Sequence, residues 1–397
     1  MIEVDELSFV VIVVTATAAA VTTMVLPRRI APPVVVIELM LGIAVGPHVL
    51  DLAQPDDFID FFSNLGLGML FFFAGYEIDF GRIRGRPLQL AALGWAISIA
   101  LAYAIGGVLA AVGVAISFLF TGSALATTAI GTLIPILRDA GELKTRFGSY
   151  LLAAGAAGEF APVLLITLVL SASQPIHEAV ILLGFVVVAV LLALISVRAM
   201  GRGWELAQRH LETSGQVPVR VTVLLVIGLA GLASELGLDI LLGGFVAGLI
   251  TRIALQGREV EVLESKLTAL GFGFLIPFFF VTSGMDVDLG ALAESAGTLL
   301  KLPLFLGLFL VVRGLPALTL YRDVLSPRDR GALAFFSATE LPLVVAITTI
   351  AVEGDHMRDS TAAALVGAAI LSTLVYPFVA LALRRGRAEP EPAPAPA

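Results

Sequence analysis

Long apolar runs dominate the chain and are separated by short clusters of charged and polar residues. A run of about 20 apolar residues is long enough for an α-helix to cross the hydrocarbon core of a bilayer. Division of the chain at the charged clusters predicts about thirteen such helices. They cover residues 8–26, 31–50, 58–78, 88–112, 116–137, 147–171, 178–198, 218–234, 238–253, 266–285, 296–320, 331–350 and 361–383. The pattern therefore predicts an all-α polytopic membrane protein, because a transmembrane β-barrel would show short alternating segments instead.

The basic residues of the loops predict the orientation of these helices. All of the 24 Lys and Arg residues except Lys301, Arg313 and Arg358 fall in loops on one side of the predicted bilayer. Acidic residues dominate the loops on the other side. By the positive-inside rule the N-terminus is outside and the C-terminus is cytoplasmic, which requires an odd number of spans. We expect a multi-pass protein of the cell (inner) membrane, in contact with the lipid bilayer.

Composition excludes several classes of protein. The chain has 397 residues, of which 58% are hydrophobic and 14% charged, and it has no cysteine, which rules out disulfides and thiolate metal sites. Its net charge of -8 does not suit nucleic acid, and no phosphate-binding loop for ATP is present. We expect residues 1–387 to form one transmembrane exchanger domain and the Pro/Ala-rich residues 388–397 a disordered cytoplasmic tail. The chain is predicted to be a transporter, not an enzyme, and to use no cofactor.

Two halves of the chain resemble each other. Residues 38–42 (ELMLG) are similar to residues 239–243 (DILLG), and the Gly, Phe-triplet, Gly and acidic order of residues 65–79 recurs in residues 270–288. The matched segments cross the predicted membrane in opposite directions. This pattern predicts two inverted repeats, about 8–171 and 218–383, joined by a linker helix 178–198. Inverted repeats are typical of secondary transporters.

Four charged residues lie within predicted spans without an evident reason. They are Glu38, Glu159, Arg313 and Glu340. An ionisable residue near the bilayer centre costs about 2.5–3.5 kcal/mol on insertion scales, so each is a candidate for function. Glu159 follows four small residues and precedes Pro162, and its carboxylate can hold a proton or a dehydrated monovalent cation. The alternative is a structural pair with an arginine. Arg313 needs a partner, for which Glu159 or Glu340 are the candidates, in a functional or a structural pair.

Two spans carry polar residues and a proline. The fifth reads TGSALATTAIGTLIP and includes Ser123, Thr127 and Thr128, whose hydroxyls, with unwound carbonyls, are candidate cation ligands. The alternative is that these hydroxyls bond to carbonyls of their own helix. The twelfth reads FFSATELPLVVAITTI and includes Ser337 and Thr339 beside Glu340. Two interrupted helices at corresponding places in a repeat indicate a substrate site.

The order of these segments resembles the monovalent cation:proton antiporter superfamily, in particular its Kef-type, sodium/hydrogen exchanger branch. The segments are PPVVVIELMLGIAVGP, LGLGMLFFFAGYEIDFGRIR, ELGLDILLGGFVAGLI and PFFFVTSGMDVDL. The resemblance implies a core domain that moves against a dimerising scaffold in an elevator-like exchange. It implies crossed, unwound fifth and twelfth helices, and a homodimer.

The resemblance also implies roles for single residues. Glu159 matches the essential acidic residue of the sixth helix, Arg313 the basic residue of the eleventh, and Glu340 the acidic residue of the twelfth. The family usually has Asp at the position of Glu159, often after Asp, Asn or Gln, whereas Gly158 stands here. Separately from the resemblance, Glu38 is predicted to be an accessory residue because it lies within a predicted span.

These observations predict exchange of a monovalent cation, Na⁺ or K⁺, for H⁺ at Glu159. With Gly158 in place of a second carboxylate, one proton per cation is the simplest stoichiometry, and exchange is electroneutral. Arg313 and Glu340 are then charge-compensating. The alternatives are a cation channel or gated efflux pathway, and a sodium-coupled symporter of an organic anion that uses Arg313.

Overall fold

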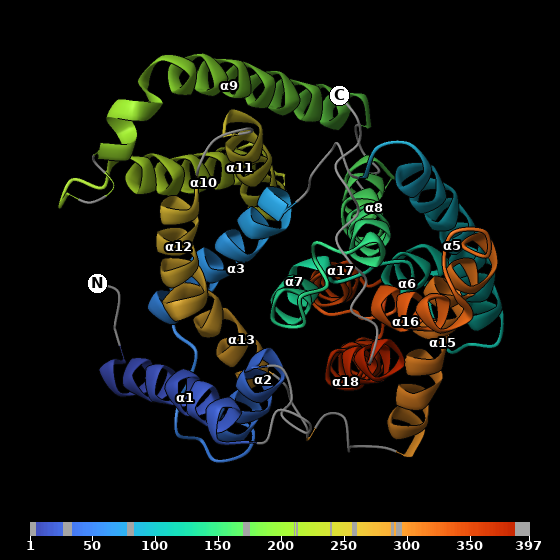
Figure 1. Ribbon diagram of the computed structural model, residues 1–397. Helices are drawn as coiled ribbons and strands as arrows, with labels where there is room; N and C mark the ends of the chain where they lie inside the picture. Colours follow the sequence, from blue (N-terminus) through green and yellow to red (C-terminus); the bar gives the residue numbers. More distant parts are fainter. Residues whose placement is uncertain are drawn as a thin grey trace. The chain divides into compact units, whose positions relative to one another are not determined.

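The structure, a computed structural model, describes residues 5–26, 34–77, 83–169, 175–209, 211, 213–238, 240–255, 260–286, 290 and 296–385. Every regular element in these ranges is a helix, as the apolar runs predict (Figure 1). The predicted tail, residues 388–397, lies outside the described residues, as do Asp79, Asp239 and Asp288 of the repeat motifs. The chain divides into two compact units, described in turn below.

Unit 1 comprises Met1–Asp79 and Thr167–Asp286. Its helices are α1 (Glu6–Val25), α2 (Val34–Val45), α3 (Asp57–Glu77), α9 (Pro175–Arg209), α10 (Val217–Glu235), α11 (Ile240–Ala254), α12 (Glu261–Leu270) and α13 (Ile276–Met285). A π-helical turn, Gly271–Leu275, joins the last two. Within this unit α2 packs on α13, and α3 packs on α11. In the predicted repeats α2 corresponds to α11 and α3 corresponds to α13. The pair of α2 with α13 in one arrangement is therefore equivalent to the pair of α11 with α3 in the other.

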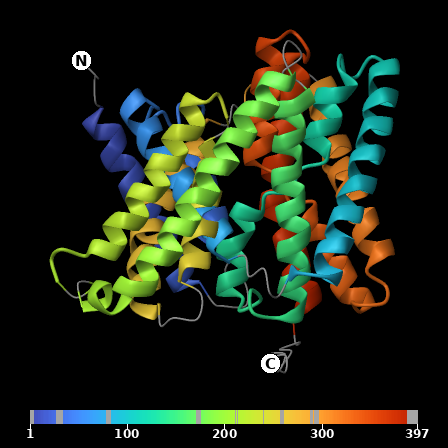
Figure 2. The same ribbon diagram turned by 90° about the horizontal axis from the view of Figure 1, so that it is seen from above.

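Unit 2 comprises Phe80–Ile166 and Val287–Ala397. Its helices are α5 (Arg86–Ala111), α6 (Phe118–Leu125), α7 (Ile130–Asp139), α8 (Arg146–Val169), α15 (Ala296–Leu320), α16 (Pro327–Ser337), α17 (Pro342–Glu353) and α18 (Asp359–Arg384). The fifth and twelfth predicted spans are each two helices with a short break between them, as predicted. The long helices of this unit run roughly along one direction in Figure 2.

Nine helices or helix pairs of the described residues are long and apolar enough to cross a membrane. They include α6 with α7, and α12 with α13, each taken as one span. Two shorter apolar helices are α2 and α11. Each of the predicted spans overlaps a helix or a helix pair of the structure. That all of them cross the membrane, and that the repeats are inverted, stay predictions.

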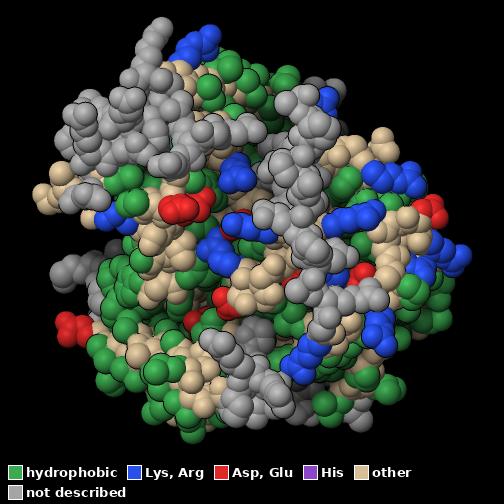
Figure 3. Space-filling view, viewed as in Figure 1, with side chains coloured by type: hydrophobic (Ala, Val, Ile, Leu, Met, Phe, Trp, Pro, Cys, Tyr) green, Lys and Arg blue, Asp and Glu red, His purple; other side chains and the backbone are tan. Residues whose placement is uncertain are grey.

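Hydrogen bonds join loops of unit 2 that the sequence predicts to lie on the same side of the membrane, while the orientation itself stays a prediction. At the predicted outer side, Arg358 donates to the carbonyl of Gly113 (2.7 Å), and Thr361 donates to the carbonyl of Val114 (3.2 Å). At the predicted cytoplasmic side, Arg384 contacts the loop after α7 and the start of α16. In the view of Figure 3, Lys and Arg side chains gather over the helices of unit 2, and Asp and Glu side chains are sparser there.

Glycines let the paired helices of unit 1 approach closely. A methyl group at Gly42 would lie 2.2 Å from the carbonyl oxygen of Val281. In the other pair, a methyl group at Gly248 would lie 2.0 Å from the carbonyl oxygen of Phe72. Small residues at helix contacts are typical of membrane proteins, in which close backbone packing replaces much of the hydrophobic effect. Glycines thus allow close backbone contact in both helix pairs.

This packing predicts that Gly248→Ala destabilises unit 1. The added methyl group meets backbone atoms, which cannot move aside as a side chain can, so we expect a loss of about 1–3 kcal/mol of folding free energy. The matched control is Gly228→Ala, where a Cβ atom meets nothing within 4 Å. That change is expected to be neutral or to stabilise α10 by up to about 1 kcal/mol. Thermal unfolding midpoints in detergent compare the two variants, and equal midpoints would contradict the packing.

Candidate functional site

The two helix breaks of unit 2 are hydrogen-bonded to each other. The first break, residues 126–129, separates α6 from α7, and the second, residues 338–341, separates α16 from α17. The amide of Ala129 donates to the carbonyl of Thr339 (2.8 Å). The hydroxyl of Thr128 donates to the carbonyl of Ser337. The amide of Ala129 and the carbonyl of Thr339, both freed by the breaks, therefore satisfy each other, which helps irregular backbone to persist in an apolar unit.

Glu159 on α8 lies beside the first break. Its side chain is fully buried, and its Oε2 accepts a hydrogen bond from the amide of Gly131 (3.1 Å). Gly131 is in the first turn of α7, so the carboxylate faces the positive end of a helix, where a negative charge is favoured. The preceding residue of α8 holds the break directly, because the carbonyl of Gly158 accepts from the amide of Thr128 (3.0 Å).

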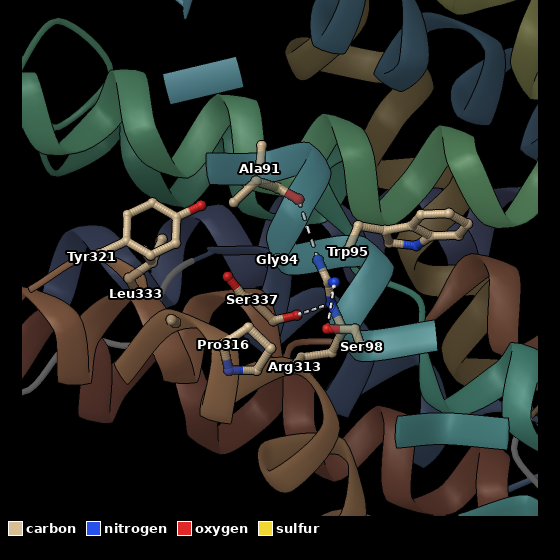
Figure 4. Close-up of a pocket in the computed structure, with 11 residues that line it drawn as sticks. Ala91, Gly94, Trp95, Ser98, Arg313, Pro316, Tyr321, Leu333 and Ser337 are labelled. Atoms are coloured by element: carbon tan, nitrogen blue, oxygen red, sulfur yellow. Dashed lines mark hydrogen bonds between the residues drawn. The ribbon is translucent and has the colours of Figure 1, made fainter. Parts of the chain in front are cut away.

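Arg313 of α15 is buried and binds neutral oxygens (Figure 4). Its Nε donates to the hydroxyl of Thr128 (2.9 Å) and to the carbonyl of Ser337 (3.4 Å). Nη1 donates to the hydroxyl of Ser98 (3.2 Å), and Nη2 donates to the carbonyl of Ala154 (3.2 Å). None of these hydrogen bonds goes to Glu159 or Glu340, but Arg313 acts electrostatically on Glu340, one of the two partners that the sequence suggested. The guanidinium instead caps the negative C-terminal end of α16, where unpaired carbonyls attract a cation.

The absence of a side chain at residue 158 has a steric reason. A Cβ atom on Gly158 would lie 2.2 Å from Nη2 of Arg313 and 2.6 Å from Oγ1 of Thr128. The guanidinium therefore fills the space that a side chain at residue 158 would enter.

Glu340 lies in the second break and is fully buried. Its Oε2 accepts a hydrogen bond from the hydroxyl of Thr127, and its Oε1 has no hydrogen-bond partner among the described residues. Helix α18 holds the backbone of Glu340, because its amide donates to Ser372 (2.9 Å) and its carbonyl accepts from Thr373 (2.8 Å). Pro342, which lacks an N–H, is the first residue of α17 and follows at once. A carboxylate is thus presented at the positive end of α17.

The sequence allows the remaining hydroxyls to be cation ligands or to bond to carbonyls of a neighbouring helical turn, and the structure shows examples that fit each interpretation. Ser123 is buried, and its hydroxyl shares a hydrogen bond with that of Tyr103 (3.2 Å). Thr339 donates to the carbonyl of Phe335 on the preceding helix, α16 (3.1 Å), and contributes its carbonyl to the crossing. The hydroxyls of Thr121 and Thr132 are fully buried and have no hydrogen-bond partner among the described residues.

Glu38 belongs to the other unit. It is buried in α2 of unit 1, whereas all the other predicted site residues belong to unit 2. Its accessory role stays a prediction.

Sequence reasoning missed three hydroxyl residues that hold the site. Ser98 on α5 accepts from Arg313 and donates to the carbonyl of Val312 (2.9 Å). Ser372 and Thr373 on α18 bind the backbone of Glu340. Each is a hydroxyl within an apolar helix, which is a weak signal, because such residues more often bond to their own helix.

The comparisons with known proteins identify the family. Residues 13–382 match the sequence model described as "Sodium/hydrogen exchanger, transmembrane". The chain belongs to the sodium/hydrogen exchanger family. This confirms the resemblance to cation:proton antiporters that the sequence motifs indicate.

Relatives of the sodium/hydrogen exchanger family match along most of the chain. YjbQ of Bacillus subtilis is 26% identical over 368 residues, which cover 88% of this chain and 58% of YjbQ, so the chain spans less than two thirds of that relative. The Na⁺/H⁺-K⁺ antiporter GerN of Bacillus cereus is 26% identical over 366 residues (88% of this chain, 89% of GerN). The Na⁺/H⁺ antiporter of Enterococcus hirae is 24% identical over 364 residues (89% and 92%).

A solved structure shares the fold. The sodium proton antiporter NhaP1 from Methanocaldococcus jannaschii superposes with a TM-score of 0.63 at 18% identity, over 95% of this chain and 98% of that chain. The predicted fold class is thereby confirmed.

Proposed function

We propose that the protein is a secondary active transporter that exchanges a monovalent cation, Na⁺ or K⁺, for H⁺. Its family and the names of GerN and the Enterococcus hirae relative support this proposal. The observation that carries it is the fully buried carboxylate of Glu159, bound to the N-terminus of α7 where two broken helices cross. A carboxylate in this place binds one positive charge at a time, either a proton or a dehydrated cation.

The crossing supplies the other ligands of a cation. Helices α6 and α16 end there and point their C-terminal carbonyls toward it, and carbonyl and hydroxyl oxygens are suited to dehydrated Na⁺ or K⁺. Ser123, Thr127 and Thr128 stay candidate ligands with Glu159. Ser337 and Thr339 contribute backbone carbonyls to the same crossing.

The charges of the site support an electroneutral exchange. Arg313 and Glu340 act on each other electrostatically. We infer that they form a charge-compensating pair, which leaves the single negative charge of Glu159 to be neutralised. One H⁺ or one cation does so. The bare carboxylate leaves the site charged, and a charged body crosses a low-dielectric region reluctantly. Only the protonated and the cation-bound forms then cross, which couples the two fluxes.

An elevator-type movement accommodates this chemistry. All the predicted site residues except Glu38 belong to unit 2, so unit 2 can carry the whole site while unit 1 serves as the dimerising scaffold. We infer a homodimer in the cell (inner) membrane, with the N-terminus outside and the C-terminus cytoplasmic.

A cation panel in proteoliposomes tests the proposal. Inward gradients of Na⁺, K⁺ and Li⁺ are imposed on vesicles that contain a pH-sensitive dye, and the wild type is expected to release protons with at least one cation. Macroscopic currents in planar bilayers would favour a channel or gated efflux pathway instead. Sodium-dependent uptake of a labelled organic anion, abolished by Arg313→Ala, would favour the symporter.

Glu340→Gln is predicted to uncouple the exchanger. The change leaves Arg313 uncompensated, so the site is neutral when Glu159 is bare and positive when Glu159 is loaded. We expect apparent cation affinity to fall about tenfold, which corresponds to about 1.4 kcal/mol, and proton flux to become sensitive to membrane potential. The control is Glu340→Asp, which keeps the charge. Potential-insensitive flux in Glu340→Gln would contradict the charge scheme.

A further inference from the structure

A buried ion triad joins three segments of unit 2. Arg384, the last residue of α18, donates to Glu142 from Nε (2.9 Å) and Nη2 (2.7 Å), and to Asp329 from Nη1 (2.8 Å). The side chains of Arg384 and Glu142 are 1% and 9% exposed, and that of Asp329 is 5% exposed. The guanidinium also lies over the ring of Phe147, 4.3 Å from its centroid. We call Arg384, Glu142 and Asp329 the Arg384 triad.

The first arm of the Arg384 triad fixes the far end of α7. Gly141 has a φ of +71°, a conformation that glycine adopts readily, and its amide donates to the carbonyl of Arg138 (3.0 Å). The amide of Glu142 donates to the carbonyl of Leu137 (2.8 Å). This pair of bonds is a Schellman motif, which ends the helix and turns the next residue in a defined direction. Glu142 is thereby rigidly attached to α7.

The second arm fixes the start of α16. Ser326 caps this helix, accepting from the amide of Asp329 (3.3 Å) and donating to its carboxylate (2.6 Å). The other carboxylate oxygen of Asp329 accepts from Arg384. Arg384 therefore contacts one end of each half-helix, α7 and α16, whose other ends meet at the breaks.

Helix α18 contacts the second break as well as the far ends of α7 and α16. Thr373, which binds the carbonyl of Glu340, precedes Arg384 by eleven residues, about three helical turns, so both lie on one face of α18. One face of α18 thus contacts both ends of α16. Arg384 binds Asp329 in the first turn of α16, and Thr373 binds Glu340 in the break that follows α16. The same Arg384 holds α7, whose other end donates to Thr339.

We propose that Arg384 is a positioning residue for cation binding: it sets the spacing of α7 and α16, and so the geometry of the two breaks, from the far end of both half-helices. A buried ion network is weak grounds for a stabilising role, because apolar replacements of such networks are often as stable. Geometric control is the better-supported role here, because the triad joins the far ends of α7 and α16 to a single residue of α18. The inference rests on the proposed function for its transport readout alone.

The test compares Arg384→Met with Arg385→Met, an exposed arginine at the next position. In proteoliposomes with matched amounts of folded protein, Arg384→Met is expected to raise the apparent KM for the cation about tenfold or more, as loss of supporting contacts does at metal sites. Vmax is expected to change less, and Arg385→Met to match the wild type. A merely structural role would lower the yield of folded protein and leave KM unchanged at matched amounts, which would overturn the proposal.

Amide hydrogen exchange provides a readout that does not depend on transport. Residues 126–129 and 338–341 are expected to exchange faster in Arg384→Met than in Arg385→Met. Equal rates would overturn the proposal, even if the wild type transported no cation, a result that would refute the proposed function separately. If Arg384→Met does not fold, Glu142→Gln, which keeps the shape of the side chain, is judged by the same KM and exchange criteria.

Discussion

Glu159→Gln is expected to abolish cation-driven proton flux in proteoliposomes. The amide keeps the size of the side chain and an oxygen that accepts from the amide of Gly131, so the fold around α7 is retained. It has no charge to bind a cation and no proton to release between pH 5 and 9, so both halves of the exchange fail together. We expect a drop of at least about 100-fold, which corresponds to about 2.7 kcal/mol of lost coupling.

The control for this variant is Glu159→Asp. It keeps the charge and shortens the side chain by about 1.5 Å, one C–C bond. Exchange is expected to persist, with a changed order of cation preference, because the carboxylate moves relative to the carbonyls of the breaks. Undiminished flux in Glu159→Gln, or its loss in both variants at equal folded protein, would contradict the role assigned to this carboxylate.

Arg313→Met is expected to inactivate the exchanger for two reasons. It leaves Glu340 and Glu159 as two negative charges that must share a proton, and it removes the donor to Ser98, Thr128 and two carbonyls. Each buried acceptor left without a donor costs about 1–3 kcal/mol, so the yield of folded protein is also expected to fall. Thermal stability and proton flux per folded molecule measure the two effects separately.

The double variant Arg313→Met/Glu340→Gln separates charge from packing. It restores a site with the single negative charge of Glu159. The charge scheme therefore predicts more flux per folded molecule than in Arg313→Met, whereas a purely structural role predicts at most the flux of the weaker single variant. Arg313→Lys keeps the charge but loses the fork of donors, and is expected to be intermediate.

The sequence predicts the second break more directly than the first. Pro342 and the polar residues before it mark the end of α16, and the break falls there. The first break contains neither glycine nor proline, and Pro135 of the predicted motif lies inside α7. Residues 126–129 leave the helix because the amides of Thr128 and Ala129 donate to the carbonyls of Gly158 and Thr339, and such tertiary bonds leave no local signal.

The hydrogen-bond partners of Arg313 also leave no local signal in the sequence. Arg313 acts electrostatically on Glu340, one of its two predicted partners, but its hydrogen bonds go to neutral oxygens presented by a helix C-terminus, α5 and α8. The same fact explains Gly158, whose missing side chain leaves room for the guanidinium. The Arg384 triad was equally hidden, because its members are separated by long stretches of chain and each resembles an ordinary loop charge.

The null point of the coupled fluxes tests the central claim most directly. Wild-type proteoliposomes are given a fixed cation ratio, and the pH difference at which net proton flux vanishes is measured with and without an imposed membrane potential. A tenfold cation ratio and one pH unit each correspond to about 1.4 kcal/mol, so one-for-one exchange at Glu159 predicts a null point at about one pH unit per tenfold ratio, unmoved by potential. A null point at about half that pH difference, or one that shifts with potential, would contradict the account.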